Sequence, residues 1–509
     1  MKSSNKVEFG DFQTPLALAR EVCELIQQLG ENPDVVVEPT AGRGAFLIAA
    51  ADTFPQANLQ GWEINDDYVT DAIAALHAAN ASKRSSVIGQ DFFNCDWEAV
   101  FAAQHGCVLV LGNPPWVTNS GIAAIEGTNL PAKENFMGLR GIAARTGKSN
   151  FDISEWMLIR LLQALRGRPA TLAMLCKTAT ARKFLRYAWQ NDGRIATSSL
   201  YRIDAAEHFD ASVGACLLYL RTGTTGPQEA DIYPTLAACE PVSRIGLAGK
   251  ELVADIDAYR SLRHLEGLCP FRWRSGVKHD CAAVMELVRM PDGSMQNTNG
   301  ERLDLEADYI FPLLKCSDLA NGRITAKRLV IVTQRFVGDD TAGIADRAPR
   351  TWSYLQAHLA RFQSRKSSIY KGRVPFSLFG IGEYAFSPWK VAVSGLHRSG
   401  RFQVVGPMSG QPVFFDDACY YLPFEREGDA RLVADILNSL LCQRFLASLV
   451  FIDSKRPFTV DLLQRLNLGV IADEAGLGAR WNQLQRSNYT IAADIPQIEF
   501  VMEQPEQPA

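Results

Sequence analysis

Val108-Leu109-Val110-Leu111-Gly112-Asn113-Pro114-Pro115-Trp116 is the stretch that decides the fold of this 509-residue chain. Its first five residues are a continuous apolar run that ends at a turn signal, which is typical of a strand buried in a parallel sheet. The two prolines lack a backbone N–H and fix φ, so the corner that follows the strand is stiff. It presents the Asn113 side-chain amide and the Pro114 carbonyl as two acceptors, which suit an exocyclic NH2 group. Trp116 adds a flat face for a planar group; a tight turn with a packing tryptophan is the alternative.

A second motif lies upstream, where the predicted strand Val35-Val36-Val37 runs into Glu38-Pro39-Thr40-Ala41-Gly42-Arg43-Gly44. A strand, a Gly-rich turn and a helix form the first unit of a doubly wound sheet. Gly42 and Gly44 allow the backbone to approach a ligand closely. The glycines do not complete the dinucleotide G-x-G-x-x-G fingerprint because position 47 is leucine. Ordinary turn chemistry is therefore an alternative interpretation.

Acidic residues follow the next two predicted strands at the points where those strands end. Glu63 follows 59–62, about 20 residues past the Gly-rich turn, where a carboxylate binds ribose hydroxyls. Ile64 is placed to pack on an adenine ring. Asp91 follows 87–89 and is placed to accept from an adenine amino group. Single acidic residues at strand ends are usually solvated, but four ordered signals indicate one ligand site at the carboxyl edge of a sheet.

Three further segments complete the N-terminal half. Thr14 and Pro15 are predicted as the N-cap and first residue of a helix whose apolar stripe runs from Leu18 to Leu29. Residues 117–151 are punctuated by glycine and carry several cations, so they are predicted as a lid or substrate clamp, with a disordered surface insertion as the alternative. Residues 221–227, rich in Thr and Gly, read as a linker.

These motifs together resemble the S-adenosylmethionine-dependent DNA adenine-N6 methyltransferases of the gamma class. In that class a Phe-x-x-Pro-type motif comes first, the Gly-rich motif second, Asn-Pro-Pro-aromatic third and the target-recognition domain last. The matching segments here are Phe12 to Pro15, Glu38 to Phe46, Asn113 to Trp116, and the chain after about residue 225. Thr40-Ala41 departs from the Ala-Cys of many members, and Arg43 is larger than the serine often found there.

The resemblance implies an α/β fold: a doubly wound Rossmann-like catalytic domain, residues 1–225, followed by a mixed α+β target-recognition domain, residues 226–509. It implies S-adenosylmethionine as the cofactor, bound by Phe12, Thr14, Pro15, Glu38, Thr40, Gly42, Gly44, Glu63, Ile64, Asp91, Phe92 and Asn113. It places catalysis at Asn113, Pro114, Pro115 and Trp116, acting on a flipped-out adenine. Phe209 matches the aromatic residue that holds the extruded base in this family, and a core phenylalanine is the alternative.

The charge pattern points to duplex DNA as the partner. A net charge of −4 and a pI near 6.1 argue against a uniformly basic nucleic-acid binder but leave room for a local basic face. Residues 350–402 hold nine Lys or Arg against one acid, Glu383, with aromatics interleaved, as in a phosphate-contacting surface. A solvated face is the alternative. With two smaller basic stretches, the predicted DNA contacts are Arg272, Arg274, Lys278, Arg365, Lys366, Lys371, Arg373, Lys455 and Arg456.

Other features exclude several classes. No apolar run reaches the roughly 20 residues that span a bilayer, and Met1 to Lys6 leads into polar sequence without a signal peptide, so we expect a cytoplasmic protein. The 11 cysteines include no Cys-x-x-Cys pair and the seven histidines are isolated, which predicts neither a metal site nor disulfides. The absence of a Pro-Cys dipeptide argues against cytosine-C5 methylation.

Two further functions stay open. The same corner would suit another planar amino group, in RNA adenine, cytosine N4 (where Ser usually precedes Pro-Pro) or protein glutamine. The enzymes that methylate RNA adenine or protein glutamine usually lack a second domain of this length, which argues against those two substrates. A catalytically silent DNA-binding module is the other alternative, and intact Asn113 and Glu63 argue against it. The sequence shows no nuclease constellation, so a restriction partner would be a separate cognate endonuclease.

Overall fold

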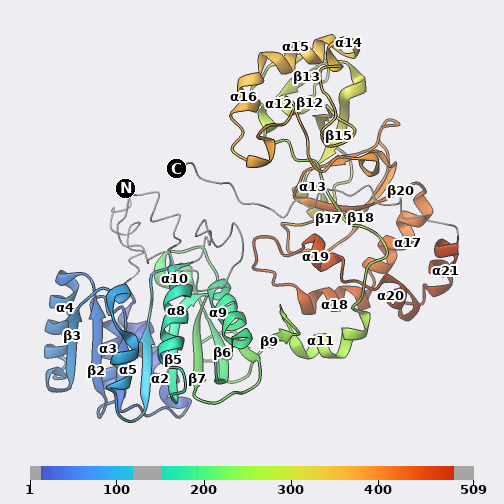
Figure 1. The fold of residues 1–509 in the computed structure, drawn as a ribbon. Helices are drawn as coiled ribbons and strands as arrows, with labels where there is room; N and C mark the ends of the chain where they lie inside the picture. Colours follow the sequence, from blue (N-terminus) through green and yellow to red (C-terminus); the bar gives the residue numbers. More distant parts are fainter. Residues whose placement is uncertain (1–12, 118–151, 192, 487–509) are drawn as a thin grey trace. The chain divides into compact units, whose positions relative to one another are not determined.

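The computed structural model describes residues 13–117, 152–191 and 193–486. The chain divides into two compact units, Met1–Asp257 and Ala258–Ala509, each with its own sheets (Figure 1). Phe12 and the predicted clamp beyond Val117 lie outside the described residues, so their roles stay predictions.

The first unit is built on a ten-stranded sheet with the order β10-β9-β8-β6-β7-β5-β4-β1-β2-β3. The strands are β1 (Val35–Glu38), β2 (Asn58–Glu63), β3 (Ser85–Gly89), β4 (Val108–Gly112), β5 (Ala170–Lys177), β6 (Ile195–Ile203), β7 (Ala215–Thr222), β8 (Glu229–Tyr233), β9 (Ser243–Ala248) and β10 (Glu251–Val253). The strands β1 to β5 pair in parallel, and β7 runs antiparallel to both β5 and β6. This arrangement confirms the predicted doubly wound Rossmann-like sheet.

Helices cover the sheet in two groups (Figure 1). They are α2 (Leu16–Gln28), α3 (Ala45–Thr53), α4 (Asp66–Ala78), α5 (Trp97–Ala102), α8 (Ile153–Ala164), α9 (Thr178–Gln190) and α10 (Ala205–Phe209). α3 packs on both α2 and α4, and α8 packs on both α5 and α9. β4 is buried at every position, with Leu109 and Leu111 in the same core as α2 and α3. A strand covered on both faces needs the continuous apolar run that β4 has.

The Gly-rich turn and the Asn-Pro-Pro corner meet because of the strand order. β1 pairs in parallel with β2 on one side and with β4 on the other, with Val37 opposite Val110. From β1 the strands β2 and β3 are added on one side of the sheet, and β4 and β5 are added on the other. Open α/β sheets bind ligands at such a switch point, beyond the carboxyl ends of the strands. The turn after β1 and the corner after β4 therefore flank the expected ligand crevice.

Two boundaries differ from the predicted ones. α2 begins at Leu16 with Pro15 as its N-cap, and no side chain caps it. The first compact unit extends past the linker predicted at 221–227, because β8 pairs in parallel with β6 and carries the sheet on to β10. The alternate burial of Ala230 and Ile232 on β8 explains why this strand joins the sheet.

The second unit is a mixed α+β structure, as predicted, with two sheets. Its four-stranded sheet has the order β11 (Arg274–Ser275), β20 (Cys419–Phe424), β17 (Trp389–Ser394) and β18 (Gln403–Val405). Its six-stranded sheet has the order β14 (Arg302–Leu303), β13 (Met295–Asn297), β12 (Glu286–Arg289), β16 (Arg328–Ile331), β15 (Ile310–Leu314) and β19 (Phe414–Phe415). The helices are α11 (Ile256–Leu262), which begins at the boundary, α12 (Ala282–Met285), α13 (Cys316–Ala320), α14 (Ile344–Arg347), α15 (Pro349–Ala357), α16 (Leu359–Gln363), α17 (Glu427–Leu437), α18 (Leu440–Leu449), α19 (Val460–Leu463), α20 (Leu468–Glu474) and α21 (Gly478–Arg486).

One predicted helix is two helices in the structure. The sequence predicts a single helix over 430–446, but α17 ends at Leu437 and α18 begins at Leu440 after the cap Ser439, whose hydroxyl accepts from Cys442 N at 3.2 Å. Among the described residues no single helix is long and apolar enough to cross a membrane. α17 and α18 pass that test only as a pair bent by 59°, and about half of the residues of each are buried in the second unit.

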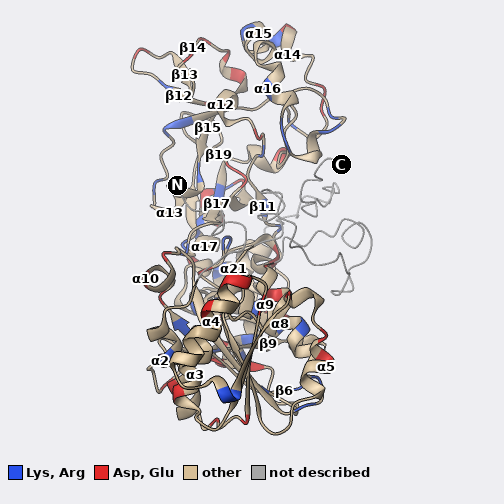
Figure 2. Cartoon of the chain, turned by 90° about the vertical axis from the view of Figure 1, so that its left-hand side faces the viewer, with Lys and Arg blue, Asp and Glu red and all other residues tan. Residues whose placement is uncertain are grey.

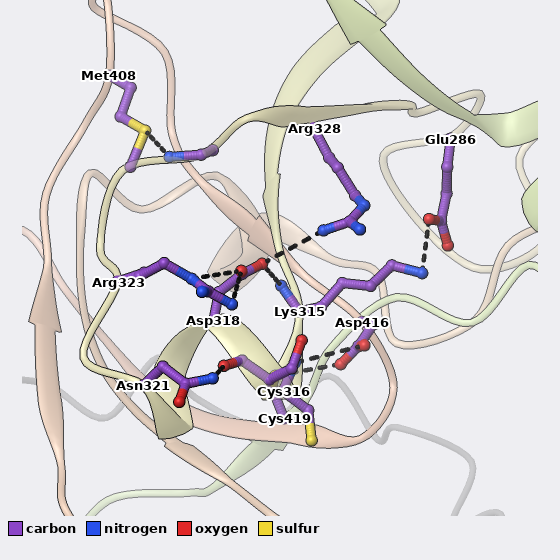
Figure 3. A network of polar contacts seen from close by, with 12 residues as sticks. Glu286, Lys315, Cys316, Asp318, Asn321, Arg323, Arg328, Met408, Asp416 and Cys419 are labelled. Atoms are coloured by element: carbon purple, nitrogen blue, oxygen red, sulfur yellow. Dashed lines mark hydrogen bonds and ion pairs between the residues drawn. The ribbon is translucent and has the colours of Figure 1, made fainter. Parts of the chain in front are cut away.

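A polar network lies where the chain of the second unit passes between its two sheets (Figure 3). Lys315, just before α13, reaches Glu286 on β12 with a distance of 2.6 Å between Nζ and Oε2. The Glu286 side chain is 7% exposed, and its other oxygen lies 3.6 Å from His279 Nε2. Asp416, between β19 and β20, accepts from Cys419 Sγ at 3.1 Å. These contacts join segments of both sheets.

We predict that Lys315→Met lowers the free energy of unfolding by about 3 kcal/mol, because it leaves the buried Glu286 carboxylate without its ion pair. Urea unfolding would measure the change. Arg302→Met is the matched control, since it breaks an exposed pair with Asp292 whose side chains are 65% and 53% exposed, and exposed ion pairs contribute little to stability. Equal stability of the two variants would contradict the prediction, and adding Glu286→Gln to Lys315→Met should recover part of the loss.

Candidate active site

The Gly-rich turn after β1 adopts a backbone that favours glycine. Gly42 has φ of +51° and Gly44 has φ of +80°, both in the left-handed region. The N–H of Gly42 donates to Oε2 of Glu63 over 2.7 Å, so the turn is tied to the end of β2. A Cβ at Gly44 would lie 3.1 Å from the Cβ of Ala72 on α4. The turn is therefore held close to both its neighbouring strand and α4.

Glu63 is oriented before any ligand arrives. Its Oε2 accepts from Gly42 N and its Oε1 accepts from Asn65 N at 2.9 Å. Backbone N–H groups thus orient both carboxylate oxygens, and carboxylate oxygens accept from hydroxyl donors such as those of a ribose. Ile64 beside it is 45% exposed and offers an apolar face. The structure thus places both predicted residues at the edge where the sequence expected them.

Asp91 and Phe92 serve local structure at the end of β3. Asp91 accepts from Phe93 N at 2.9 Å and from Asn94 Nδ2 at 3.4 Å, capping a short 3-10 turn. Phe92 is buried, with its ring centroid 4.9 Å from that of Trp97. The side chain of Phe92 therefore supports the strand end from inside the core. The part of both residues in cofactor binding stays a prediction.

Glu38 is a buried carboxyl at the end of β1. It is 3% exposed, and its Oε2 has no hydrogen-bond partner among the described residues. Burial raises the pKa of this carboxyl well above its ordinary range, and the nearby charge of Glu63 raises it further. A Cβ at Gly112 would lie 3.5 Å from Glu38 Cγ, so the carboxyl lies beside the end of β4. An unsatisfied buried acceptor at a sheet edge suits a ligand that brings an amine.

Thr14 and Gln13 tie the corner to the Gly-rich turn. Asn113 Nδ2 donates to Thr14 Oγ1 over 3.2 Å. With the amide nitrogen assigned to the Thr14 side, the acceptor oxygen Oδ1 faces away from Thr14. The hydroxyl of Thr40 donates to the Asn113 carbonyl at 3.5 Å. Gln13 Oε1 accepts from Arg43 N at 3.2 Å. Thr14 thus orients the predicted catalytic amide instead of capping α2, and no sequence signal singled out Gln13.

Trp116 and Phe209, predicted to hold the extruded base between them, lie in direct contact with each other in this structure. Their ring centroids are 5.0 Å apart with an angle of 66° between the planes, and both residues belong to the buried core. A base stacked between two rings needs about twice the van der Waals separation, roughly 7 Å. The two rings in this structure leave no such gap, so a base would have to part them or pack on one face alone. In this structure Phe209 is therefore a core phenylalanine, and its part in holding a base stays a prediction.

The predicted DNA-contacting cations divide into two groups in the second unit. Lys366, Lys371, Arg373 and Lys455 are exposed. Arg365 is tied inward: it donates to the carbonyls of Phe362, His279 and Ser377, and its guanidinium lies 3.6 Å from the Tyr370 ring centre. The remaining four are half-buried or engaged within the unit: Arg272, Arg274 over Tyr384, Lys278 with Asp280 and Asp417, and Arg456 with Tyr420.

The basic character of 350–402 is therefore only partly a surface property. Lys390 is 1% exposed, and burial lowers the pKa of its ammonium to about 7. Arg350 is paired with Asp304 and Glu306. Two of the exposed cations, Lys371 and Arg373, line a pocket of about 220 Å³ beside α16 together with the half-buried Arg365, and the exposed Lys366 follows Arg365 in the chain. Figure 2 marks Lys and Arg in blue along α15, α16 and the chain around them.

Among the residues that the structure describes, no group of three or more His, Cys, Asp or Glu is placed to hold a metal ion. The chemistry available at the sheet edge is that of oriented acceptors: two carboxyl groups, an amide and backbone carbonyls. Such a set binds hydroxyls, amines and amino groups.

The chain is similar in sequence to two type II methyltransferases and in fold to a restriction-modification enzyme. No protein-family model matches the chain. M.NspV, a type II methyltransferase of Nostoc sp. (strain ATCC 29411 / PCC 7524), is 43% identical over 471 residues, which cover 92% of this chain and 98% of that protein. M.XamI, a type II methyltransferase of Xanthomonas campestris pv. amaranthicola, is 29% identical over 113 residues, 22% of this chain and 20% of M.XamI. The solved structure of the type IIL restriction-modification enzyme MmeI with DNA shares the fold, with a TM-score of 0.59 at 12% identity over 96% of this chain and 73% of MmeI.

The buried carboxyl of Glu38 predicts a pH-dependent stability in the absence of ligand. Its raised pKa means that the folded chain keeps a proton that the unfolded chain releases above the ordinary pKa of 4.5. Stability should therefore fall as pH rises from that value through the raised pKa. Glu38→Gln has no proton to lose, so its advantage over the wild type should grow with pH in urea unfolding.

Glu24→Gln, an exposed glutamate on α2, is the control and should follow the wild type at every pH. Parallel pH profiles of Glu38→Gln and the wild type would show that the Glu38 carboxyl is already ionised in the folded chain.

Proposed function

The chain belongs to the type II DNA methyltransferases, and we propose that it transfers a methyl group from S-adenosylmethionine to N6 of a flipped-out adenine in duplex DNA. The observation that carries the proposal is the Asn113 amide, oriented by Thr14 at the end of β4 and beside the Gly-rich turn of β1. A base inside a duplex cannot reach such a corner, so the target must leave the stack.

The residues at the sheet edge fit S-adenosylmethionine, which the methyltransferase fold implies and which supplies an electrophilic methyl group when bound. Glu63, oriented by two backbone N–H groups, would accept hydrogen bonds from the ribose hydroxyls, and Ile64 offers a face for the adenine ring. Glu38 would accept from the amino group, which would satisfy its buried Oε2. Gly42 and Gly44 adopt left-handed backbone conformations and have no side chains, so a ligand can approach the backbone of the turn closely.

The corner acts on the target by accepting hydrogen bonds. Asn113 Oδ1 and the Pro114 carbonyl would each accept one hydrogen of the amino group. This draws the nitrogen lone pair out of conjugation with the ring, so it can form the new N–C bond while the methyl group leaves its sulfur and a proton leaves the nitrogen afterwards. No side chain at the corner needs to act as a base, so catalysis rests on positioning and electrostatics.

Cytosine N4 and other amino groups present the same two donors, so the corner by itself does not distinguish them. Asparagine before Pro-Pro favours adenine, because the cytosine-N4 enzymes usually carry serine there. The oriented Glu63 and the unsatisfied Glu38 oxygen both argue against a silent DNA-binding module, which would have no use for them.

We assign the DNA-phosphate contacts to the exposed cations around the pocket beside α16, namely Lys366, Lys371 and Arg373. Arg365 would build the wall of that pocket, because its donors are already used by backbone carbonyls. MmeI, which shares the fold, was solved in complex with DNA. A cognate restriction endonuclease would be a separate protein.

Asn113→Ala should abolish methyl transfer while leaving the dissociation constant of S-adenosylmethionine nearly unchanged, because the amide acts on the target. Transfer of labelled methyl groups to DNA, followed by digestion to nucleosides and mass spectrometry, measures both the rate and the modified base. The proposal predicts N6-methyladenine.

Asn191→Ala, which removes an exposed asparagine at the end of α9, is the control and should keep full activity. If the product is N4-methylcytosine, the target is cytosine and not adenine. Undiminished turnover by Asn113→Ala would show that the corner takes no part in the mechanism.

Changing Lys366, Lys371 and Arg373 together to Gln should weaken DNA binding on all sequences alike and make its salt dependence shallower. Each phosphate contact contributes about 0.9 to the slope of log K against log salt concentration. The control triple Lys250, Arg431 and Arg480 to Gln removes the same charge at exposed positions elsewhere. Identical slopes for the two triples would mean that the α16 face is merely solvated.

A further inference from the structure

Lys177 ends β5, the strand next to β4, and its ammonium group contacts the corner directly. Nζ donates to the carbonyl of Trp116 over 2.7 Å and to Oδ2 of Asp152 over 2.6 Å. The two side chains are 23% and 8% exposed, so this ion pair is largely shielded from water. Charge-assisted hydrogen bonds are shorter and stronger than neutral ones. The backbone of Trp116 is thus tied to the neighbouring strand by a strong contact.

Asp152, the counter-ion, is itself held in place. It caps α8, with Oδ1 accepting from both the N–H and the hydroxyl of Ser154. The next residue, Ile153, donates its N–H to the Val117 carbonyl at 2.9 Å, so α8 also meets the chain just after the corner. α8 is buried over most of its length. Lys177 therefore links Trp116 to two rigid elements, β5 and α8.

The corner depends on such outside contacts. Pro114 and Pro115 have no N–H, so they cannot extend the ladder that holds β4. At its first residue the corner is held by the Thr14 and Thr40 contacts to Asn113. At its last residue the Lys177 bond holds the Trp116 carbonyl. The prolines make the corner stiff, and the contacts at its two ends set where this stiff unit lies.

We propose that Lys177, with Asp152 as its counter-ion, is a positioning residue for methyl transfer that acts through Trp116. It fixes the backbone of Trp116, and with it the face on which the target base packs while Asn113 holds the amino group. The inference rests on the proposed function in taking Trp116 as the residue that receives the base. Sequence reasoning passed over Lys177 because a lysine at the end of a strand carries no signal of its own.

The test uses the full-length protein with Lys177→Met, which keeps the side-chain length and removes the charge and the donors. The single-turnover rate of methyl transfer should fall about 100-fold, the effect of a misplacement of roughly 1 Å. The dissociation constant of S-adenosylmethionine should stay at its wild-type value, whereas the melting temperature should fall because Asp152 is left buried without its counter-ion. Lys177→Arg, which can donate to both oxygens, should recover most of the rate.

Lys183→Met is the matched control. Lys183 lies on the next helix, α9, and pairs with Glu155 of α8 at 3.6 Å without contacting the corner. It should leave the rate unchanged. If Lys177→Met does not fold because Asp152 is left buried without a counter-ion, Lys177→Met with Asp152→Asn removes both charges and carries the same test.

A double-mutant cycle decides whether Lys177 acts through Trp116. In a Trp116→Ala background, Lys177→Met should cost little further rate, because the indole face whose position Lys177 sets is already gone. Additive losses would overturn the proposal. So would a wild-type rate in Lys177→Met, or a loss of rate matched by an equal loss of cofactor affinity. The rate is measured for whichever base is methylated. A target other than adenine would therefore contradict the proposed function but not the role of Lys177.

Discussion

The parallel pairing of β1 with β4 is the constraint on which the rest of the catalytic unit depends. Val35, Val36 and Val37 lie opposite Val108, Leu109 and Val110, so both strands end at the same height. Two motifs more than 60 residues apart in the chain thereby become neighbours. A one-residue slip would turn every side chain of β4 to the other face. The continuous burial of β4 and the core that includes Leu109 and Leu111 hold this register.

The site that results is a set of acceptors fixed by contacts to the backbone. Glu63 is held by two N–H groups, Asn113 by Thr14, and Trp116 by Lys177. Such preorganisation matters because acceptors that are already in place need not reorganise during the reaction. The carboxyls of Glu38 and Glu63 also suit a positively charged ligand, and the sulfonium of S-adenosylmethionine carries that charge. Glu38, whose raised pKa favours its protonated form in the free chain, would become the partner of the ligand amine.

Much of the fold could be predicted from the sequence, because buried parallel strands are apolar runs and Gly-rich turns have few alternatives. The carboxyl ends of β2 and β4, with the polar residues Glu63 and Asn113 placed there, could be predicted from the apolar runs that precede them. The roles of Gln13, Thr14 and Lys177 did not, because each depends on a contact with a residue distant in sequence. The charge excess of 350–402 misled in part, because charge counting cannot reveal that Lys390 is buried or that Arg365 is bound to carbonyls.

The central claim is that the cofactor and the target amino group meet at the edge formed by β1, β2 and β4. A crystal structure of the chain with S-adenosylmethionine tests it most directly. The account predicts ribose hydroxyls on the Glu63 carboxylate, the amino group on Glu38, and the methyl group directed toward the Asn113 amide. A cofactor bound elsewhere, or one bound here with its methyl group turned away from Asn113, would contradict it.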